Sequence, residues 1–308
     1  NRHAKLNLSA SSREAVIIQS MTKAERTALI SLPLVILIGA GVAWAGSQGS
    51  AEVGGLPLFA ICVATAFLVQ WLVFIPAYLR QTEKFFDLTG SLTYISVTIL
   101  AVVLSPVRDG RSLILLAMIL IWAIRLGTFL FRRIQKEGKD GRFDELKPSF
   151  IRFLMVWTLQ GLWVTFTAAA ALIAITSSHR QPLGWAAGLG ALIWAIGFGL
   201  EVIADNQKTR FKAAPANKGK FINTGLWAKS RHPNYFGEIV LWLGVTIVAL
   251  PVLQGWQWVA LTSPVFVIVL ITRVSGIPML ERRADERWGG QPAYEQYKKE
   301  TPVLIPKL

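Results

Sequence analysis

The sequence is short of cysteine, histidine and charged residues, and each shortage excludes a class of protein. The single Cys62 cannot build a disulfide framework or a cysteine-based zinc site, and its apolar surroundings predict a buried packing residue. With three histidines in all, and only His232 near other charged motif residues, we expect no metal site. Charged residues make up 16% of the chain, whereas a soluble domain carries about 25%.

Apolar residues, by contrast, make up 53% of the 308 residues and gather in long blocks. About 20 such residues cross the roughly 30 Å of hydrocarbon in a bilayer, and the backbone there must be helical because no water is available to it. We therefore predict an all-α, polytopic transmembrane helix bundle with about eight (seven or eight) spans. The blocks cover residues 28–46, 56–79, 86–106, 112–131, 150–177, 183–204, 235–250 and 257–273.

The first 20 residues are polar and mixed, and the chain opens with Asn1. The stretch from Met21 to Glu25 looks like a natural start. We expect residues 1–20 to be an added or upstream segment and leave them out of the fold. The first apolar block has no convincing cleavage site, so no cleavable signal peptide is expected.

Lysine and arginine set the orientation, because they stay on the cytoplasmic side of a membrane. With the N-terminus inside, the inner segments hold 28 Lys and Arg and the outer loops hold only Arg108, Arg111 and Arg180. We predict that both termini are cytosolic, in a bacterial inner membrane. The same bias accounts for the net charge of +14, with attraction to anionic lipid, and no nucleic-acid partner is expected because no such module is present.

Ionisable residues inside the spans are functional candidates, because burying a charge in a bilayer is costly. All of them fall in the predicted cytosolic half of the membrane. A transporter places such groups near the midplane, whereas an enzyme with a charged cytosolic cofactor places them at one side. The alternative is a set of ion pairs that only holds the bundle together. The residues are Asp87, Arg125, Glu201, Asp205, Glu238 and, at the end of the last block, Arg273.

The segment 205–238 is the richest in motifs. Lys208, Arg210 and Lys212 recur at a spacing of two, and such side chains bind phosphate. Pro233 suits the first turn of a helix, so the residues around it would lie at a helix N-terminus, which favours anions. The alternatives are ordinary juxtamembrane charge and, for Trp227 and Tyr235, interfacial anchoring.

Two sequence runs carry a family resemblance. Gly225-Leu226-Trp227 followed by Arg231-His232-Pro233-Asn234-Tyr235-Phe236-Gly237-Glu238 resembles the C-terminal part of the steroid 5-alpha-reductase family, and the segment from Arg273 through Glu281 to Ile305-Pro306 does so as well. The likeness covers roughly residues 80–308 and is strongest over 200–308. It extends to the related sterol reductases and isoprenylcysteine carboxyl methyltransferases. It implies a division into residues 21–148 on the substrate side and 149–308 on the cofactor side.

The resemblance implies a cytosol-facing cofactor, either NADPH or S-adenosylmethionine. The many basic residues favour NADPH, because S-adenosylmethionine has no phosphate to bind. A Rossmann fingerprint is absent, so the helices themselves would hold the dinucleotide. Glu201 stands where the animal reductases have Asn. The implied cofactor residues are Arg125, Glu201, Asp205, Lys208, Lys212, Lys220, Trp227, Arg231, His232, Asn234, Tyr235, Glu238, Arg273 and Glu281.

The family reduces a carbon–carbon double bond conjugated to a ketone, and a proton donor stabilises the charge that develops on the ketone oxygen. In the animal enzymes that the chain resembles, a Gln-Glu pair and a Tyr on the next helix have this role, but Trp122 stands at the Tyr position here. We therefore assign Asp87 and Tyr94, two helical turns apart on one face, as the catalytic pair. Gln81 and Glu83 are the alternative.

The implied substrate is a flat apolar enone, such as a steroid-like lipid, that enters from the membrane. Phe86, Trp122 and Trp157 are predicted to contact it, with Phe85, Trp163 and Phe166 as further candidates, and plain packing is the alternative for each. Besides membrane lipid, no protein partner is evident. A lipid-directed methyltransferase and a non-enzymatic sterol-binding protein remain as alternative functions.

Overall fold

A computed structural model describes residues 21–307, so the prediction for residues 1–20 lies outside the described residues. Within that range, eight helical segments are long and apolar enough to cross a membrane, which confirms the predicted polytopic helix bundle. Seven of these spans each start with one α-helix, and the seventh continues past α8 to Val252. The helices are α2 (Lys23–Gly46), α3 (Leu58–Leu79), α4 (Phe86–Leu104), α5 (Gly110–Glu137), α6 (Phe150–Thr176), α7 (Trp185–Ala213) and α8 (Pro233–Ala249).

The eighth span, Gly255–Trp288, is composite. It changes from the 3-10 helix η5 (Gly255–Leu261) to α9 (Thr262–Val269), then to the π-helical turn η6 (Leu270–Val274), and after a bend to α10 (Ile277–Trp288). A last helix, α11 (Pro292–Glu300), follows. The remaining elements are the hairpin β1 (Glu52–Val53) and β2 (Leu56–Pro57) and the 3-10 turns η1 (Gly141–Phe143), η2 (Pro215–Asn217), η3 (Gly225–Ala228) and η4 (Leu250–Val252).

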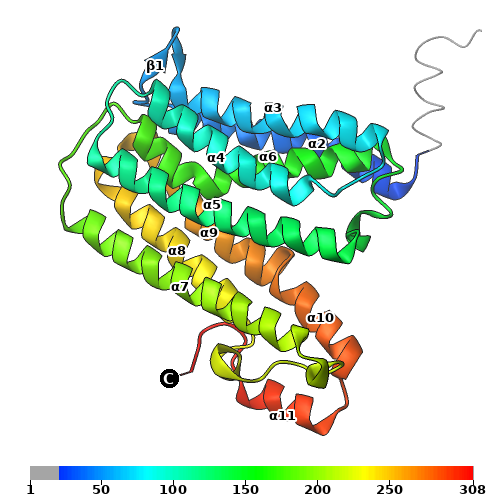
Figure 1. Ribbon diagram of the computed structural model, residues 1–308. Helices are drawn as coiled ribbons and strands as arrows, with labels where there is room; N and C mark the ends of the chain where they lie inside the picture. The colour runs from blue at the N-terminus through cyan, green and yellow to red at the C-terminus, as the bar shows by residue number, and fades with distance from the viewer. Residues whose placement is uncertain (1–20, 308) are drawn as a thin grey trace, which may run out of the picture.

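Helices α2 to α6 run alongside one another, α7 and α8 form a pair next to them, and α10 and α11 extend beyond the bundle (Figure 1). Helix α6 is the central one, because 78% of its most apolar stretch is buried, compared with 28% for α2 and for α7. We call the end with the hairpin the β1 end and the opposite end the α10 end. The predicted division at residue 148 stays a prediction, and α6 packs among α2, α3 and α4.

Helices α7 and α8 approach each other closely along a row of four glycines. A Cβ atom added to Gly197 would lie 2.4 Å from the backbone N of Leu241, and one added to Gly237 would lie 2.6 Å from the backbone N of Glu201. In the other half of the pair, a Cβ atom added to Gly190 would lie 2.7 Å from the carbonyl oxygen of Gly244, and one added to Gly244 would lie 2.5 Å from the backbone N of Trp194. Small residues let two membrane helices pack backbone to backbone, and this crossing fixes α8 against the polar turns of α7.

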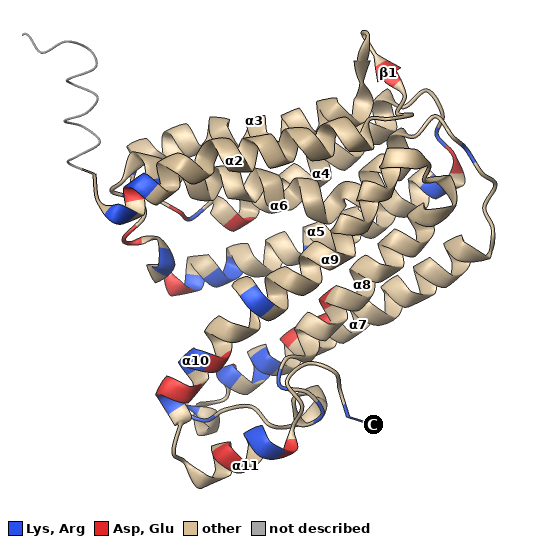
Figure 2. Ribbon diagram, turned by 180° about the vertical axis from the view of Figure 1, so that it is seen from behind, with Lys and Arg blue, Asp and Glu red and all other residues tan. Residues whose placement is uncertain are grey.

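Charged residues gather at the α10 end, along the ends of α5 and α7 and on α10 and α11 (Figure 2). Few lie at the β1 end. This is the one-sided distribution from which the orientation was predicted, and it places the α10 end as the candidate cytosolic side. The orientation itself stays a prediction.

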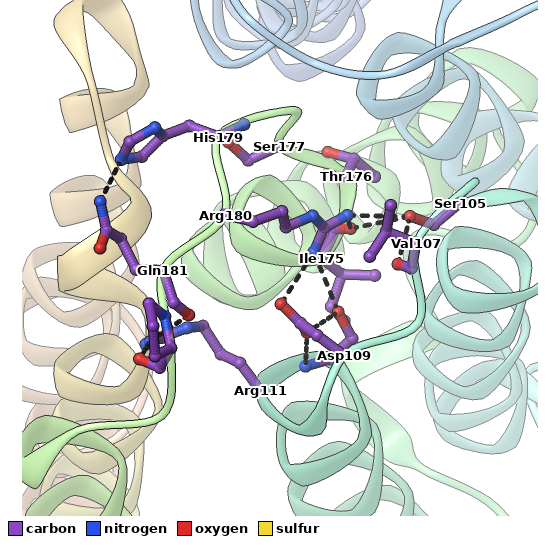
Figure 3. Close-up of polar contacts among 12 residues, drawn as sticks. Ser105, Val107, Asp109, Arg111, Ile175, Thr176, Ser177, His179, Arg180 and Gln181 are labelled. Atoms are coloured by element: carbon purple, nitrogen blue, oxygen red, sulfur yellow. Dashed lines mark hydrogen bonds and ion pairs between the residues drawn. The ribbon is translucent and has the colours of Figure 1, made fainter.

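The three arginines of the β1 end bind helix C-termini. Arg108 donates to two carbonyl oxygens in the last turn of α4, and Arg111 donates to that of Val248 in α8 at 2.7 Å. Arg180 donates to the carbonyl of Ile175 in α6 at 2.9 Å (Figure 3). A cation is favoured there because a helix is negative at its C-terminus and its last carbonyls lack intrahelical partners. These arginines are therefore structural caps.

Candidate functional site

A buried ion cluster joins three helices near the α10 end. The two Nη atoms of Arg125 in α5 contact the carboxylates of Glu201 and Asp205 in α7, one each. Both carboxylates face α5 because they are four residues apart on the helix. The Asn234 amide of α8 donates to the second oxygen of Asp205 at 3.1 Å. The structure thus brings together four of the residues that the resemblance assigned to the cofactor.

Glu238 of α8 stands beside this cluster but has no hydrogen-bond or ion-pair partner among residues 21–307. Its neighbour Gly237 lies against the backbone of Glu201, so the tight helix crossing holds Glu238 next to the carboxylates of α7. Both Nη atoms of Arg125 are already engaged by those carboxylates. Glu238 is therefore the carboxyl group of the cluster that is left without a cation.

The Arg231–Glu238 motif is anchored to α10 through Glu281. One oxygen of Glu281 contacts Arg231 and the other lies 2.7 Å from Nε2 of His232. The His232 ring stacks on Tyr235, with ring centroids 5.8 Å apart. Burial lowers the pKa of His232 from its ordinary value, although the Glu281 carboxylate opposes this. A neutral imidazole at neutral pH follows, with its Nδ1 buried and unpaired.

Basic side chains surround the mouth of the site. Lys208 lies over the Trp227 ring at 4.5 Å from its centroid, and the Trp227 indole donates to the carbonyl of Ala204 at 3.0 Å. Lys212, Lys220 and Arg273 are exposed and have no carboxylate partner among the described residues. These three predicted cofactor residues are free to bind an anion.

Asp87 and Tyr94, the residues predicted to act on the ketone oxygen of the substrate, lie in two different places. Asp87 is at the start of α4, 3.4 Å from Arg133 of α5. Tyr94 lies two turns deeper, only 6% exposed, and its ring meets Trp122 edge-on with centroids 5.0 Å apart. The ring of Trp242, from α8, contacts both of these aromatic rings. The structure therefore brings Tyr94 to Trp122 and keeps Asp87 at the mouth with Arg133.

The other predicted substrate residues form a separate aromatic cluster. Phe86 meets Trp157 edge-on, with ring centroids 5.1 Å apart, and both pack with Phe143 and Phe153. The alternative acid Glu83 is buried in the neighbouring loop. There it accepts hydrogen bonds from the Lys147 ammonium at 2.6 Å and from the backbone N–H of residue 140 at 2.8 Å.

Sequence reasoning missed Arg133, Arg142 and Trp242. Trp242 is four residues after Glu238, so helical periodicity alone places the two on one face. Arg142 lies in the 3-10 turn η1, binds Asp140 and is within electrostatic reach of Asp87, and no signal in the sequence placed it beside α4. Arg133 lies near the end of α5, in a charged stretch that looked like ordinary juxtamembrane charge, and only the fold shows that Asp87 is its partner.

The loop before α8 is held by the C-terminal segment. The Tyr297 hydroxyl donates to the carbonyl of Trp227 at 2.6 Å, and the Ser230 hydroxyl donates to the carbonyl of Leu304 at 2.7 Å. The backbone of residues 229 and 231 also bonds to that of residues 307 and 302. We call residues 292–307 the C-terminal strap. It fixes the loop from which the motif enters the membrane.

A surface hollow of about 600 Å³ lies at the other end of the molecule, among the loops of the β1 end. Gln48, His179 and the segment 254–257 line it. No lysine, arginine or carboxylate belongs to its lining, so the hollow has no charged group that would hold a phosphate. The chemistry-bearing residues gather at the α10 end instead.

Comparison with known proteins places the chain. Over residues 73–301 the sequence matches the family described as "Protein of unknown function (DUF1295)". The chain belongs to this family. Every predicted site residue from Asp87 to Glu281 falls in the matched region, whereas α2 and most of α3 precede it.

Two curated relatives are similar to the chain. One is an uncharacterized protein of Schizosaccharomyces pombe, 24% identical over 232 residues, which are 66% of this chain and 65% of that protein. The other is the steroid 5-alpha-reductase DET2 of Gossypium hirsutum, 29% identical over 128 residues, which are 42% of this chain and 45% of that protein. The chain thus spans less than two thirds of either relative. No solved structure matches it.

Proposed function

We propose that this DUF1295 protein is a membrane-embedded reductase. It would use NADPH to reduce the carbon–carbon double bond of a flat, apolar α,β-unsaturated ketone, such as a steroid-like lipid. The α10 end would face the cytosol, in a bacterial inner membrane, with the substrate entering from the lipid and no other protein required. The similarity to a plant steroid 5-alpha-reductase supports an oxidoreductase.

The observation that carries the proposal is a group of cations held close together at the α10 end. Lys208 lies within electrostatic reach of both Lys212 and Arg133. Only Arg133 has a carboxylate partner, and that contact is 3.4 Å long. Like charges repel most strongly where water is scarce, so a polyanion that joins them is favoured. The pyrophosphate and 2′-phosphate of NADPH supply such charge, whereas S-adenosylmethionine carries a cationic sulfonium and no phosphate.

The neighbouring polar groups fit the rest of a dinucleotide. Four atoms of the motif and the ion cluster are buried without a hydrogen-bond partner: Glu201 Oε2, Arg231 Nε, His232 Nδ1 and Asn234 Oδ1. Unpaired buried polar atoms cost about 1–3 kcal/mol each, so a ligand with sugar hydroxyls and an amide would be stabilised by pairing them. When bound, NADPH supplies a hydride to the β carbon of the enone.

The chain's own residues would then act on the ketone oxygen. Tyr94 is the candidate donor, because its buried hydroxyl, beside that of Thr167, makes no hydrogen bond of normal geometry, and the rings of Trp122 and Trp242 pack against its own ring. It would donate a hydrogen bond to the oxygen as negative charge develops there. Asp87, held by Arg133 at the mouth, would position the start of α4, and Phe86, Trp122 and Trp157 would contact the apolar body of the substrate.

The experiment is a nucleotide and turnover assay on detergent-purified protein. We expect NADPH to raise the melting temperature more than NADH does, and S-adenosylmethionine to leave it unchanged. A Δ4-3-ketosteroid such as progesterone should then consume NADPH. Stabilisation by S-adenosylmethionine alone would instead support a methyltransferase. NADPH binding with no turnover over a broad panel of enones would support a sterol-binding protein.

A further inference from the structure

Glu238 is the motif residue whose carboxyl group has no hydrogen bond and no ion pair among the described residues. We propose that Glu238 is the proton reservoir of the site, passing its proton to the Tyr94 hydroxyl, which delivers one to the ketone oxygen of the substrate. The inference rests on the proposed reductase function and deepens it. It gives Glu238 a role in proton transfer, where the resemblance had implied only contact with the cofactor.

The first step concerns the Tyr94 hydroxyl. It is buried in the middle of α4 beside the Thr167 hydroxyl of α6, but it makes no hydrogen bond of normal geometry, and the indole N–H groups of Trp122 and Trp242 nearby are unpaired as well. Three polar groups without partners in one aromatic cluster are rare in folded proteins. A substrate oxygen placed among them would accept hydrogen bonds that the protein alone leaves unmade.

The second step concerns the position of Glu238 between this cluster and the ion cluster. Trp242 is one helical turn beyond Glu238 on α8, so both share a face, and the Trp242 and Tyr94 ring centroids are 6.2 Å apart. Glu238 itself lies within electrostatic reach of Tyr94. It is half-buried, with some of its surface accessible. It therefore connects the deep hydroxyl to the polar side of the site.

Three carboxyl groups lie near Arg125: those of Glu201, Asp205 and Glu238. Glu201 and Asp205 are each in direct contact with an Nη atom of Arg125. Contact with a cation favours the ionised form of a carboxyl group, and that form has no proton to give. Glu238 has no ion pair and no hydrogen-bond donor among the described residues, and Arg125 acts on it only over a longer range. Of the three carboxyl groups, Glu238 has the weakest contact with a cation and can carry a proton to Tyr94.

The proton balance of the step is complete. As the β carbon of the substrate gains a hydride, the π bond shifts toward the ketone and its oxygen takes the Tyr94 proton. The Tyr94 phenolate takes the Glu238 proton, and the Glu238 carboxylate recovers one from cytosolic water. The enol then returns to the ketone form: its α carbon takes a proton from water and its oxygen releases one to water. One hydride and one proton are consumed for each double bond reduced.

The test uses Glu238→Gln and Glu238→Asp, with Glu286→Gln on the exposed face of α10 as the matched control. We expect Glu238→Gln to lower kcat by 10²-fold or more, in the range of a lost general acid, while NADPH affinity by fluorescence titration changes less than threefold. Glu238→Asp keeps the carboxyl and should recover part of the rate. In the nucleotide-free protein, the infrared band of a protonated carboxyl group should be present in the wild type and absent in Glu238→Gln.

The pH profile adds a second readout. Wild-type kcat should fall as the pH rises and the reservoir loses its proton, and this dependence should disappear in Glu238→Gln. Near-wild-type turnover in Glu238→Gln, or an unchanged infrared band, would overturn the proposal. A wild type that binds no NADPH would overturn the proposed function instead. The charged and titratable groups that face Glu238 are Arg125 from α5, Glu201 and Asp205 from α7, Tyr94 from α4 and Tyr235 from α8.

Discussion

At the scale of single residues, the ion cluster shows how a membrane helix tolerates charge. Arg125 satisfies two carboxylates at once, and the planar guanidinium suits this because its N–H groups point in fixed directions. Two carboxyl groups share one cation in this cluster. The second oxygen of Asp205 is satisfied by an uncharged donor, the Asn234 amide.

Removing the cation should destabilise the protein strongly. In Arg125→Gln, the carboxylates of Glu201 and Asp205 would be left buried side by side, and breaking a buried ion pair from one side costs about 3–5 kcal/mol. Thermal unfolding in detergent should show the loss, and Glu201→Gln in the same chain should restore part of it. Arg283→Gln, on exposed α10, is the control. Equal melting temperatures for Arg125→Gln and this control would contradict the assigned role.

A pH dependence follows from Glu83 in the α3–α4 loop. Burial raises its pKa, but the hydrogen bonds from Lys147 and from the backbone of Asp140 lower it more, so the net pKa is below the ordinary value. A carboxylate whose pKa is lowered by folding stabilises the protein above about pH 4.5 and loses this effect as the pH falls through the folded value. The melting temperature of Glu83→Gln should therefore change less than that of the wild type between about pH 6 and pH 3. Parallel curves would show that this carboxylate makes no such contribution.

At the scale of helices, hydropathy predicts the spans well but not their ends. The block 183–204 continues as helix α7 to Ala213, because Lys208 and Lys212 lie beyond the apolar stretch and hydropathy reads only the membrane part. The last block, 257–273, contains three helical types in succession, 3-10, α and π, which composition cannot distinguish. The ion cluster was predicted as a one-sided set of charges, but the pairing of Arg125 with both Glu201 and Asp205 depends on how α5 meets α7.

The glycine row between α7 and α8 gives a matched pair of substitutions. A methyl group at Gly197 would clash with the Leu241 backbone at 2.4 Å, whereas one at Gly199 meets nothing within 4 Å. We expect Gly197→Ala to destabilise the protein by about 1–3 kcal/mol, as overpacking does. Gly199→Ala should be neutral or stabilise it by up to about 1 kcal/mol through helix propensity. The two melting temperatures decide, and a Gly197→Ala protein as stable as Gly199→Ala would show that the helices can separate at no cost.

At the scale of the whole molecule, the charged residues and the apolar bundle are separated in space. Under the proposed function, an apolar substrate would partition into the lipid around the bundle, while a charged nucleotide would reach the α10 end from water. Figure 2 shows this separation along one axis. The positive-inside pattern in the sequence predicted which end is charged. It could not predict that the three arginines of the other end are caps on helix C-termini, because their carbonyl partners come from distant segments.

The C-terminal strap should matter for nucleotide binding more than for the bundle. Truncation after Thr301 would remove the acceptor of Ser230 and the backbone partner of Arg231, and so release the loop before α8. We expect the helix content, measured by circular dichroism, to be nearly unchanged. The apparent affinity for NADPH, measured from its thermal stabilisation, should fall at least tenfold, which is about 1.4 kcal/mol of binding free energy. Unchanged NADPH affinity would show that the motif holds its shape without the strap.

The strap also sets an order of events during synthesis. Ser230 is separated from its partner Leu304 by 74 residues, which a ribosome adds in roughly 4 to 15 s at common rates of elongation. Helices α2 to α6 can enter the membrane and pack before then. The α10 end has to wait, with the loop before α8 not yet held by the strap. A newly made chain would therefore pass through an interval in which the bundle is packed but the candidate site is not yet assembled.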